Sequence, residues 1–165
     1  MRQVPGPLSA PRAAGTFAAM ESPPASRALP DLAATETLAT ELAAWLAPGR
    51  AVLLEGPLGA GKTTLARAML RRLAGDPALP VPSPSYTLVQ SYETPRGVIH
   101  HLDLWRIGGP AEMLELGFGE LREDALIIEW PERLGDLTPP DALRVRLAIT
   151  GETARRAEIS SPGDL

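Results

Sequence analysis

Residues 56–63 are Gly56-Pro57-Leu58-Gly59-Ala60-Gly61-Lys62-Thr63, which match the pattern G-x-x-x-x-G-K-[ST] without a mismatch. In loops of this pattern, glycines let backbone N–H groups approach phosphate oxygens, and the lysine ammonium lies against the terminal phosphates. Lys62 is the only lysine of the chain, and arginine supplies positive charge everywhere else. The stretch therefore predicts a nucleotide-phosphate site that needs a compact ammonium rather than a planar guanidinium.

The residues on either side of the loop predict a strand before it and a helix after it. Ala51-Val52-Leu53-Leu54-Glu55 is a short apolar run, which indicates a buried strand. From Thr63 to Leu73, apolar residues recur at helical spacing. This context suits the motif, because the helix N-terminus attracts phosphate and the Thr63 hydroxyl can reach Mg²⁺.

Length and composition indicate one soluble domain. The chain has 165 residues, of which 44% are hydrophobic and 22% charged, as in ordinary globular proteins. The net charge of −4 argues against broad attraction to nucleic acid, and the absence of cysteine excludes disulfides and thiolate chemistry. No run approaches the roughly 18 apolar residues of a membrane span. We therefore expect a cytoplasmic protein with no membrane contact.

The N-terminal part of the chain differs from the rest. Prolines interrupt it at Pro5, Pro7, Pro11, Pro23, Pro24 and Pro30, with alanine and serine frequent between them. Such a segment has little apolar surface to bury, and it lacks the apolar centre of a signal peptide. We expect residues 1–30 to be a disordered extension and residues 31–160 to be a single P-loop ATPase domain.

Apolar patterning predicts further elements along that domain. Helices are expected at Thr35–Leu46 and Pro110–Leu116, and strands at Tyr86–Tyr92, Val98–Leu104, Ala125–Trp130, Leu143–Ile149 and Arg155–Ser160. The alternation in Leu143–Ile149 favours an antiparallel or edge strand that pairs with the last one. The whole predicts an α/β fold of the P-loop NTPase type, with a mostly parallel sheet, antiparallel additions and helices on both faces.

Two acids are candidates to complete the site. Asp103 and Glu129 each follow an apolar run, as expected of a carboxylate at the end of a strand that neighbours the phosphate loop. Spacing alone leaves open which of them contacts Mg²⁺. We favour Glu129 for the metal ion, and Asp103 for contacts around the ion or to the attacking water.

Three other features invite a functional interpretation. His100 and His101 are adjacent in a predicted strand and therefore point to opposite faces, so packed or hydrogen-bonded histidines are favoured over a metal pair. Trp105 and Trp130 are expected to form core or cleft walls. The hydroxyls of residues 83–87 can sense a γ-phosphate, with Ser85 and Thr87 as candidates, although a simple proline turn fits equally well.

Four sequence blocks, taken together, resemble the TsaE family, the bacterial ATPases required for threonylcarbamoylation of tRNA. The blocks are EGPLGAGKTT at 55–64, SPSYTLV at 83–89, HLDLWR at 101–106 and IEWPER at 128–133. The resemblance runs from about Thr35 to Ile149. Two positions depart from the usual family pattern, because Ser85 replaces a threonine and Trp105 replaces a tyrosine whose phenol is therefore lost.

The resemblance implies ATP and Mg²⁺ as cofactors and a TsaB–TsaD-like heterodimer as partner. In that family, TsaD transfers threonylcarbamoyl to the adenosine next to the anticodon, and ATP hydrolysis resets the complex, so tRNA is contacted only indirectly. We expect Lys62, Asp103 and Glu129 to be catalytic and Thr63, Asp103 and Glu129 to lie at the metal ion. The expected nucleotide-binding residues are Thr35, Gly56, Pro57, Leu58, Gly59, Ala60, Gly61, Lys62, Thr63 and Thr64.

Rival functions fit the sequence less well. A small-molecule P-loop kinase needs a lid with several arginines; Arg106 and Arg133 are available, but no lid-sized insertion is visible. A GTPase needs a second lysine in its guanine-binding motif, and the chain has none. A nucleotide-binding scaffold without turnover does not explain the two acids.

Overall fold

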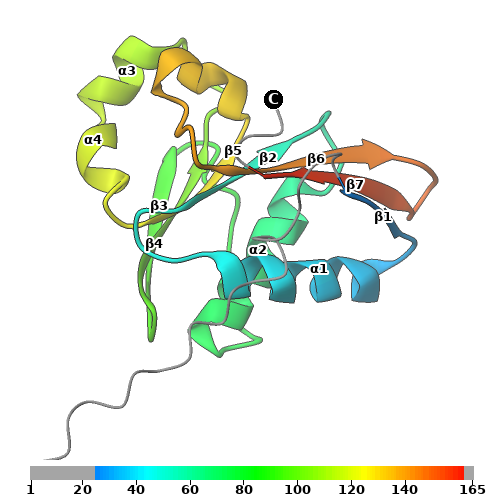
Figure 1. The fold of residues 1–165 in the computed structure, drawn as a ribbon. Coiled ribbons are helices and arrows are strands. Elements are labelled where there is room, and N and C mark those ends of the chain that lie inside the picture. Colours follow the sequence, from blue (N-terminus) through cyan, green and yellow to red (C-terminus); the bar gives the residue numbers. More distant parts are fainter. Residues whose placement is uncertain (1–24, 162–165) are drawn as a thin grey trace, which may run out of the picture.

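The structure, a computed structural model, describes residues 25–161 of the chain. Its elements, in chain order, are β1 (Ala25–Leu29), α1 (Leu32–Trp45), β2 (Ala51–Glu55), α2 (Lys62–Ala74), β3 (Val89–Thr94), β4 (Gly97–Asp103), α3 (Pro110–Glu115), α4 (Phe118–Leu121), β5 (Ala125–Glu129), the 3₁₀-helical segment η2 (Pro131–Leu137), β6 (Leu143–Ile149) and β7 (Arg155–Ser160). Figure 1 shows these elements arranged around one twisted sheet.

The sheet has seven strands in the order β1-β7-β6-β2-β5-β4-β3. The four strands β6, β2, β5 and β4 run parallel in its centre. Antiparallel pairs extend it on both sides, β6 with β7 and β7 with β1 on one flank, and β4 with β3 on the other. The predicted α/β fold with a parallel centre and antiparallel additions is confirmed.

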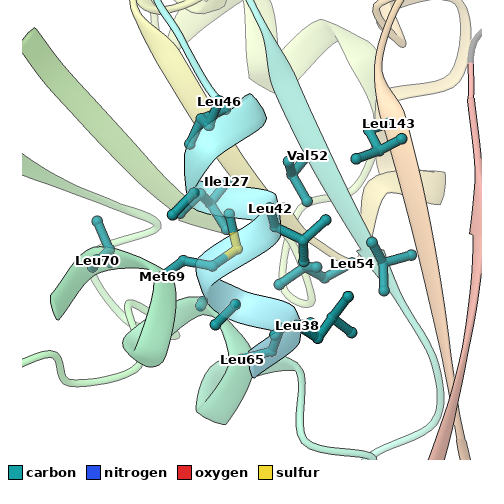
Figure 2. Packing of buried hydrophobic residues seen from close by; sticks show 14 of the residues in the cluster. Leu38, Leu42, Leu46, Val52, Leu54, Leu65, Met69, Leu70, Ile127 and Leu143 are labelled. Atoms are coloured by element: carbon teal, nitrogen blue, oxygen red, sulfur yellow. The ribbon is translucent and has the colours of Figure 1, made fainter. Parts of the chain in front are cut away.

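Helices cover both faces of the sheet (Figure 1). Neighbouring residues of β2 alternate between the two layers, with Leu54 packing beneath α1 and α2 and Leu53 packing beneath α3, α4 and η2. Figure 2 shows the first layer, where side chains of α1, α2 and the central strands meet; among them are Leu38, Leu42, Leu65, Met69 and Ile127. Burial on both sides explains why the central strands are almost wholly apolar.

The strand β1 corrects the expected start of the domain. Ala25–Leu29 pairs antiparallel with β7 along its whole length, and Leu29 is buried in the first layer with 3% of its surface exposed. The prediction that a disordered extension runs to residue 30 is therefore wrong for these five residues. The rest of that prediction concerns residues 1–24, which lie outside the described part of the chain.

One more expected strand needs correction, and for another the structure decides between two alternatives. The strand predicted at Tyr86–Tyr92 begins only at Val89, because residues 85–88 form a turn in which Leu88 has φ +66° and its N–H donates to the Pro84 carbonyl at 2.7 Å. For Leu143–Ile149, expected to be an antiparallel or an edge strand, the antiparallel alternative is confirmed. β6 pairs antiparallel with β7, as predicted, and it also runs parallel to β2, so it does not lie at the edge of the sheet.

Local chemistry explains where the two long helices begin and end. Helix α1 begins after Asp31, whose side chain accepts a hydrogen bond from the Ala34 N–H at 2.9 Å. Helix α2 ends at Gly75, which adopts the left-handed conformation that glycine favours at this position. No helix within residues 25–161 has both the length and the apolar character needed to cross a bilayer.

Candidate nucleotide and metal site

The phosphate-loop residues join the end of β2 to the start of α2 in the centre of the sheet. Gly56 has φ +143°, and a Cβ placed there would lie 2.6 Å from the Leu147 carbonyl oxygen. Gly61 has φ +99° and precedes Lys62, the first residue of α2. Any other residue is thus strained at both positions, and the loop brings its backbone to the helix N-terminus as an anion site requires.

Lys62 is almost fully buried, with 5% of its surface exposed. Its Nζ donates hydrogen bonds to the carbonyls of Gly56 at 2.6 Å and Pro57 at 2.9 Å, and lies 4.0 Å from the ring centroid of Trp130. Burial lowers the pKa of the Lys62 ammonium, an effect opposed by the carboxylates of Glu129, Glu132 and Asp103. The Lys62 ammonium is therefore held by two carbonyl groups of the loop and by the face of the Trp130 ring.

Glu129 ends β5 and is held from two sides. It is paired in register with Leu54 of β2, which brings it beside the first turn of α2. The Thr63 hydroxyl lies 3.0 Å from each carboxylate oxygen, and His101 Nε2 lies 2.8 Å from Oε1. Because only 2% of the residue surface is exposed, these contacts define the position of the carboxylate.

Asp103 ends β4 directly beside Glu129, since the two are Cα partners in adjacent parallel strands. Its Oδ2 accepts hydrogen bonds from Ser83 at 3.2 Å and Ser85 at 3.0 Å, and its Oδ1 accepts one from the Trp105 amide at 3.0 Å. The structure therefore brings Lys62, Thr63 and both predicted acids to one edge of the sheet. It also ties the 83–87 segment to this edge through the two serines.

The donor atoms at this edge fit Mg²⁺. Hydroxyl and carboxylate oxygens come from Thr63, Glu129 and Asp103, and Mg²⁺ prefers such hard ligands. No group of three or more histidine, cysteine or acidic side chains within residues 25–161 has the arrangement of a metal site.

The two histidines lie as the alternation of a strand predicts. His101 contacts Glu129, whereas His100 is bonded through Nδ1 to Ser91 at 2.7 Å and through Nε2 to Asp124 at 2.9 Å. The interpretation of both as hydrogen-bonded residues is confirmed.

The tryptophans form a wall of the site. The rings of Trp105 and Trp130 lie 4.4 Å apart between centroids, and Trp130 also faces Lys62. Trp130 has φ +57°, a strained value for a large side chain, directly after Glu129. Arg106 lies over the ring of Tyr86, 4.4 Å from its centroid, and so connects the block after Asp103 with the 83–87 segment.

Comparison with models of protein families shows to which family this chain belongs. The family model described as "Threonylcarbamoyl adenosine biosynthesis protein TsaE" matches residues 29–157, which include every site residue described above. This chain belongs to the TsaE family.

Curated TsaE family members are similar over most of this chain. The protein named tRNA threonylcarbamoyladenosine biosynthesis protein TsaE in Rickettsia felis is 39% identical over 126 residues, which are 76% of this chain and 73% of that protein. The protein of the same name in Nostoc sp. is 36% identical over 138 residues, 80% of this chain and 83% of that protein. The crystal structure of YdiB from Bacillus subtilis has the same fold, with a TM-score of 0.67 at 23% identity over 88% of this chain and 90% of that one.

A cavity of about 420 Å³ adjoins the loop of this TsaE family member at Ala60, Gly61 and Thr64. It is lined by Thr35, Gly61, Thr64 and Arg155, among others, and Arg155 Nη2 donates to the Gly59 carbonyl at 3.1 Å. Thr35 therefore lies beside the loop, and its role in binding a nucleotide stays a prediction. Arg155 was missed, because no local pattern distinguishes it from the other arginines of the last two strands.

Proposed function

We propose that this protein binds and hydrolyses Mg²⁺-ATP and thereby supports the biosynthesis of threonylcarbamoyladenosine in tRNA. The observation that carries the proposal is the meeting of Lys62, Thr63, Asp103 and Glu129 at one edge of the sheet. Membership of the TsaE family and the names of the curated relatives support the pathway.

The loop and Lys62 would bind the phosphates. The ammonium of Lys62 would exchange its carbonyl contacts with Gly56 and Pro57 for β- and γ-phosphate oxygens, while Trp130 keeps it oriented. The cavity beside Thr35 and Arg155 is continuous with the Gly61 end of the loop and would take the nucleoside.

Thr63 and Glu129 would hold the metal ion, directly or through water. An ion held by these residues would neutralise charge on the phosphates. Asp103 would orient and accept a proton from the attacking water, a role that suits a carboxylate bonded to the hydroxyls of Ser83 and Ser85. This division between the acids is part of the proposal.

The partner would be a TsaB–TsaD-like heterodimer, with tRNA contacted only through that complex. Large apolar side chains are exposed around the mouth of the site, notably Leu58 of the loop, Tyr86 of the 83–87 segment and Trp105. Arg106 packs on Tyr86, so a partner bound here would contact the 83–87 segment. A change in the hydrogen bond between Ser85 and Asp103 could thus reach the partner through this segment. Hydrolysis would then reset the complex between turnovers.

Release of inorganic phosphate from ATP, measured with and without TsaB and TsaD, tests the proposal. Slow release by the isolated protein and faster release with both partners is the expected result. Phosphate transferred to a metabolite would instead indicate a small-molecule kinase. Tight nucleotide binding without any release, even with the partners present, would indicate a scaffold.

A further inference from the structure

His101 lies behind the proposed metal site and takes no part in the chemistry described so far. It belongs to β4, two residues before Asp103, and its side chain is completely shielded from solvent. Its Nε2 lies 2.8 Å from Glu129 Oε1. The pair crosses from β4 to β5 in the interior of the protein.

The hydrogen-bonding pattern indicates which ring nitrogen carries the hydrogen. Nδ1 of His101 is buried and has no hydrogen-bond partner among the described residues. A buried N–H without an acceptor is costly, whereas Nε2 has a carboxylate acceptor. The contacts therefore favour the tautomer that donates from Nε2–H to Glu129, and the ring acts as a fixed donor.

The two carboxylate oxygens of Glu129 differ in their hydrogen-bond partners. The Thr63 hydroxyl is equidistant from both, at 3.0 Å, and so does not orient the carboxylate by itself. His101 contacts only Oε1. A carboxylate held at one oxygen has little freedom to rotate, and its other oxygen keeps a fixed position beside Thr63.

We propose that His101 is a positioning residue, which holds Glu129 Oε1 and so presents Oε2 to a metal ion that would bind beside Thr63. This inference rests on the proposed function, since it assigns a role towards the Mg²⁺ of that site. Partners of this kind, which bond to a ligating carboxylate, typically contribute about 10–100-fold to metal affinity. A buried donor that merely satisfied Glu129 would stabilise the fold without affecting the ion.

The neighbouring histidine provides a matched control. His100 lies in the same strand and also bonds to a carboxylate, that of Asp124, but on the opposite face and away from the phosphate loop. We would compare His101→Leu, which removes the donor, His101→Gln, whose amide retains a donor near Nε2, and His100→Gln. Melting temperatures would be recorded for all three.

The measurement is the Mg²⁺ concentration that half-maximally enhances binding of a fluorescent ADP analogue. For His101→Leu we expect this concentration to rise about 10–100-fold, with binding in the absence of Mg²⁺ unchanged. His101→Gln should recover most of the loss, and His100→Gln should match the wild type. An unaltered Mg²⁺ dependence in a folded His101→Leu variant would overturn the inference.

A second measurement uses the wild-type protein and does not depend on any variant's folding. Nitrogen-15 spectra of labelled histidine should show His101 as the Nε2–H tautomer, and a hydrogen on Nδ1 alone would refute the inference. Failure of the proposed function is a separate result: wild-type protein that binds the ADP analogue equally well with and without Mg²⁺ would contradict the metal site itself.

Discussion

Glu129 and Asp103 end adjacent parallel strands at paired positions, but different parts of the molecule hold them. Glu129 is held by Thr63 from the first turn of α2 and by His101 from the core. Asp103 is held by Ser83 and Ser85, which come from the connection between α2 and β3. One acid thus depends on rigid, buried elements and the other on a surface segment.

This difference indicates that the site can keep Glu129 in a fixed position while the contacts of Asp103 change. Ser83 is exposed and Ser85 half-buried, so the segment can change its contacts without opening the core, whereas any displacement of Glu129 disturbs buried groups. We therefore expect Glu129 to fix the metal ion and Asp103 to respond to the state of the nucleotide.

The largest effect is expected at Lys62, because both acids are proposed to act on the phosphates that it would hold. Lys62→Ala should lower the rate of ATP hydrolysis by at least about 10²–10³-fold, the cost of losing a preorganised electrostatic donor. Lys62→Arg should not restore it, since the guanidinium is planar and larger than the ammonium that the loop encloses. Phosphate release reports the rates, and near-normal turnover in the arginine variant would contradict the point-charge argument.

The two acids should be separable by their effects on binding. Glu129→Gln and Asp103→Asn should each lower turnover by at least about 10²-fold, near the lower end of acid–base contributions. Only Glu129→Gln should also abolish the Mg²⁺ dependence of nucleotide affinity, because Asp103 is proposed to act on the attacking water. Titration with a fluorescent ATP analogue at several Mg²⁺ concentrations measures this. If Asp103→Asn loses the Mg²⁺ dependence and Glu129→Gln keeps it, the assignment is reversed.

The serines should affect the response to the γ-phosphate more than binding. Replacing both Ser83 and Ser85 by alanine removes two hydrogen bonds to Asp103, and a loss of about 1.5 kcal/mol corresponds to roughly tenfold slower turnover. Hydrogen exchange of residues 81–92 should differ between an ATP analogue and ADP in the wild type, but not in the double variant. Equal protection in both nucleotide states of the wild type would leave the segment a structural turn.

The smallest effect on turnover is expected far from both acids, in β1. Deleting residues 1–29 removes the pairing of β1 with β7 and the burial of Leu29, which alone corresponds to about 1.5–3 kcal/mol of stability. The melting temperature should fall by several degrees. The losses of turnover caused by Glu129→Gln and by Asp103→Asn should keep the same ratio in the shortened protein as in the full chain. Deleting residues 1–24 is the matched control and should leave the melting temperature unchanged, as the proline-rich composition predicts.

Patterning within the sequence predicted several elements to the residue. The expected bounds of β2, β6 and β7 agree with the structure, because their apolar residues recur at the spacing of a buried or half-buried strand. β1 was missed, since its short segment lies among prolines and becomes a strand only through pairing with distant β7. β3 starts late because Leu88 has a left-handed backbone conformation, which the residue types around this position do not predict.

The sequence predicted the residues of the candidate site but not the contacts between them. The loop motif predicted Lys62 and Thr63 as site residues, and the ends of the apolar runs predicted Asp103 and Glu129; the structure brings these four candidates together. The order β2-β5-β4, which sets Glu129 against Thr63 and Asp103 one strand further away, depends on long-range pairing. The same holds for Arg155, which reaches the loop from β7.

Reconstitution of tRNA modification tests the central claim most directly. Purified TsaB and TsaD, tRNA, the threonylcarbamoyl donor and ATP would be combined with the wild-type protein or with Lys62→Ala, and modified tRNA counted per TsaD. We predict many turnovers with the wild type and no more than about one with the variant, because the proposed function requires an ammonium at the phosphates for hydrolysis and for resetting. Equal multiple turnover with both proteins would contradict the account.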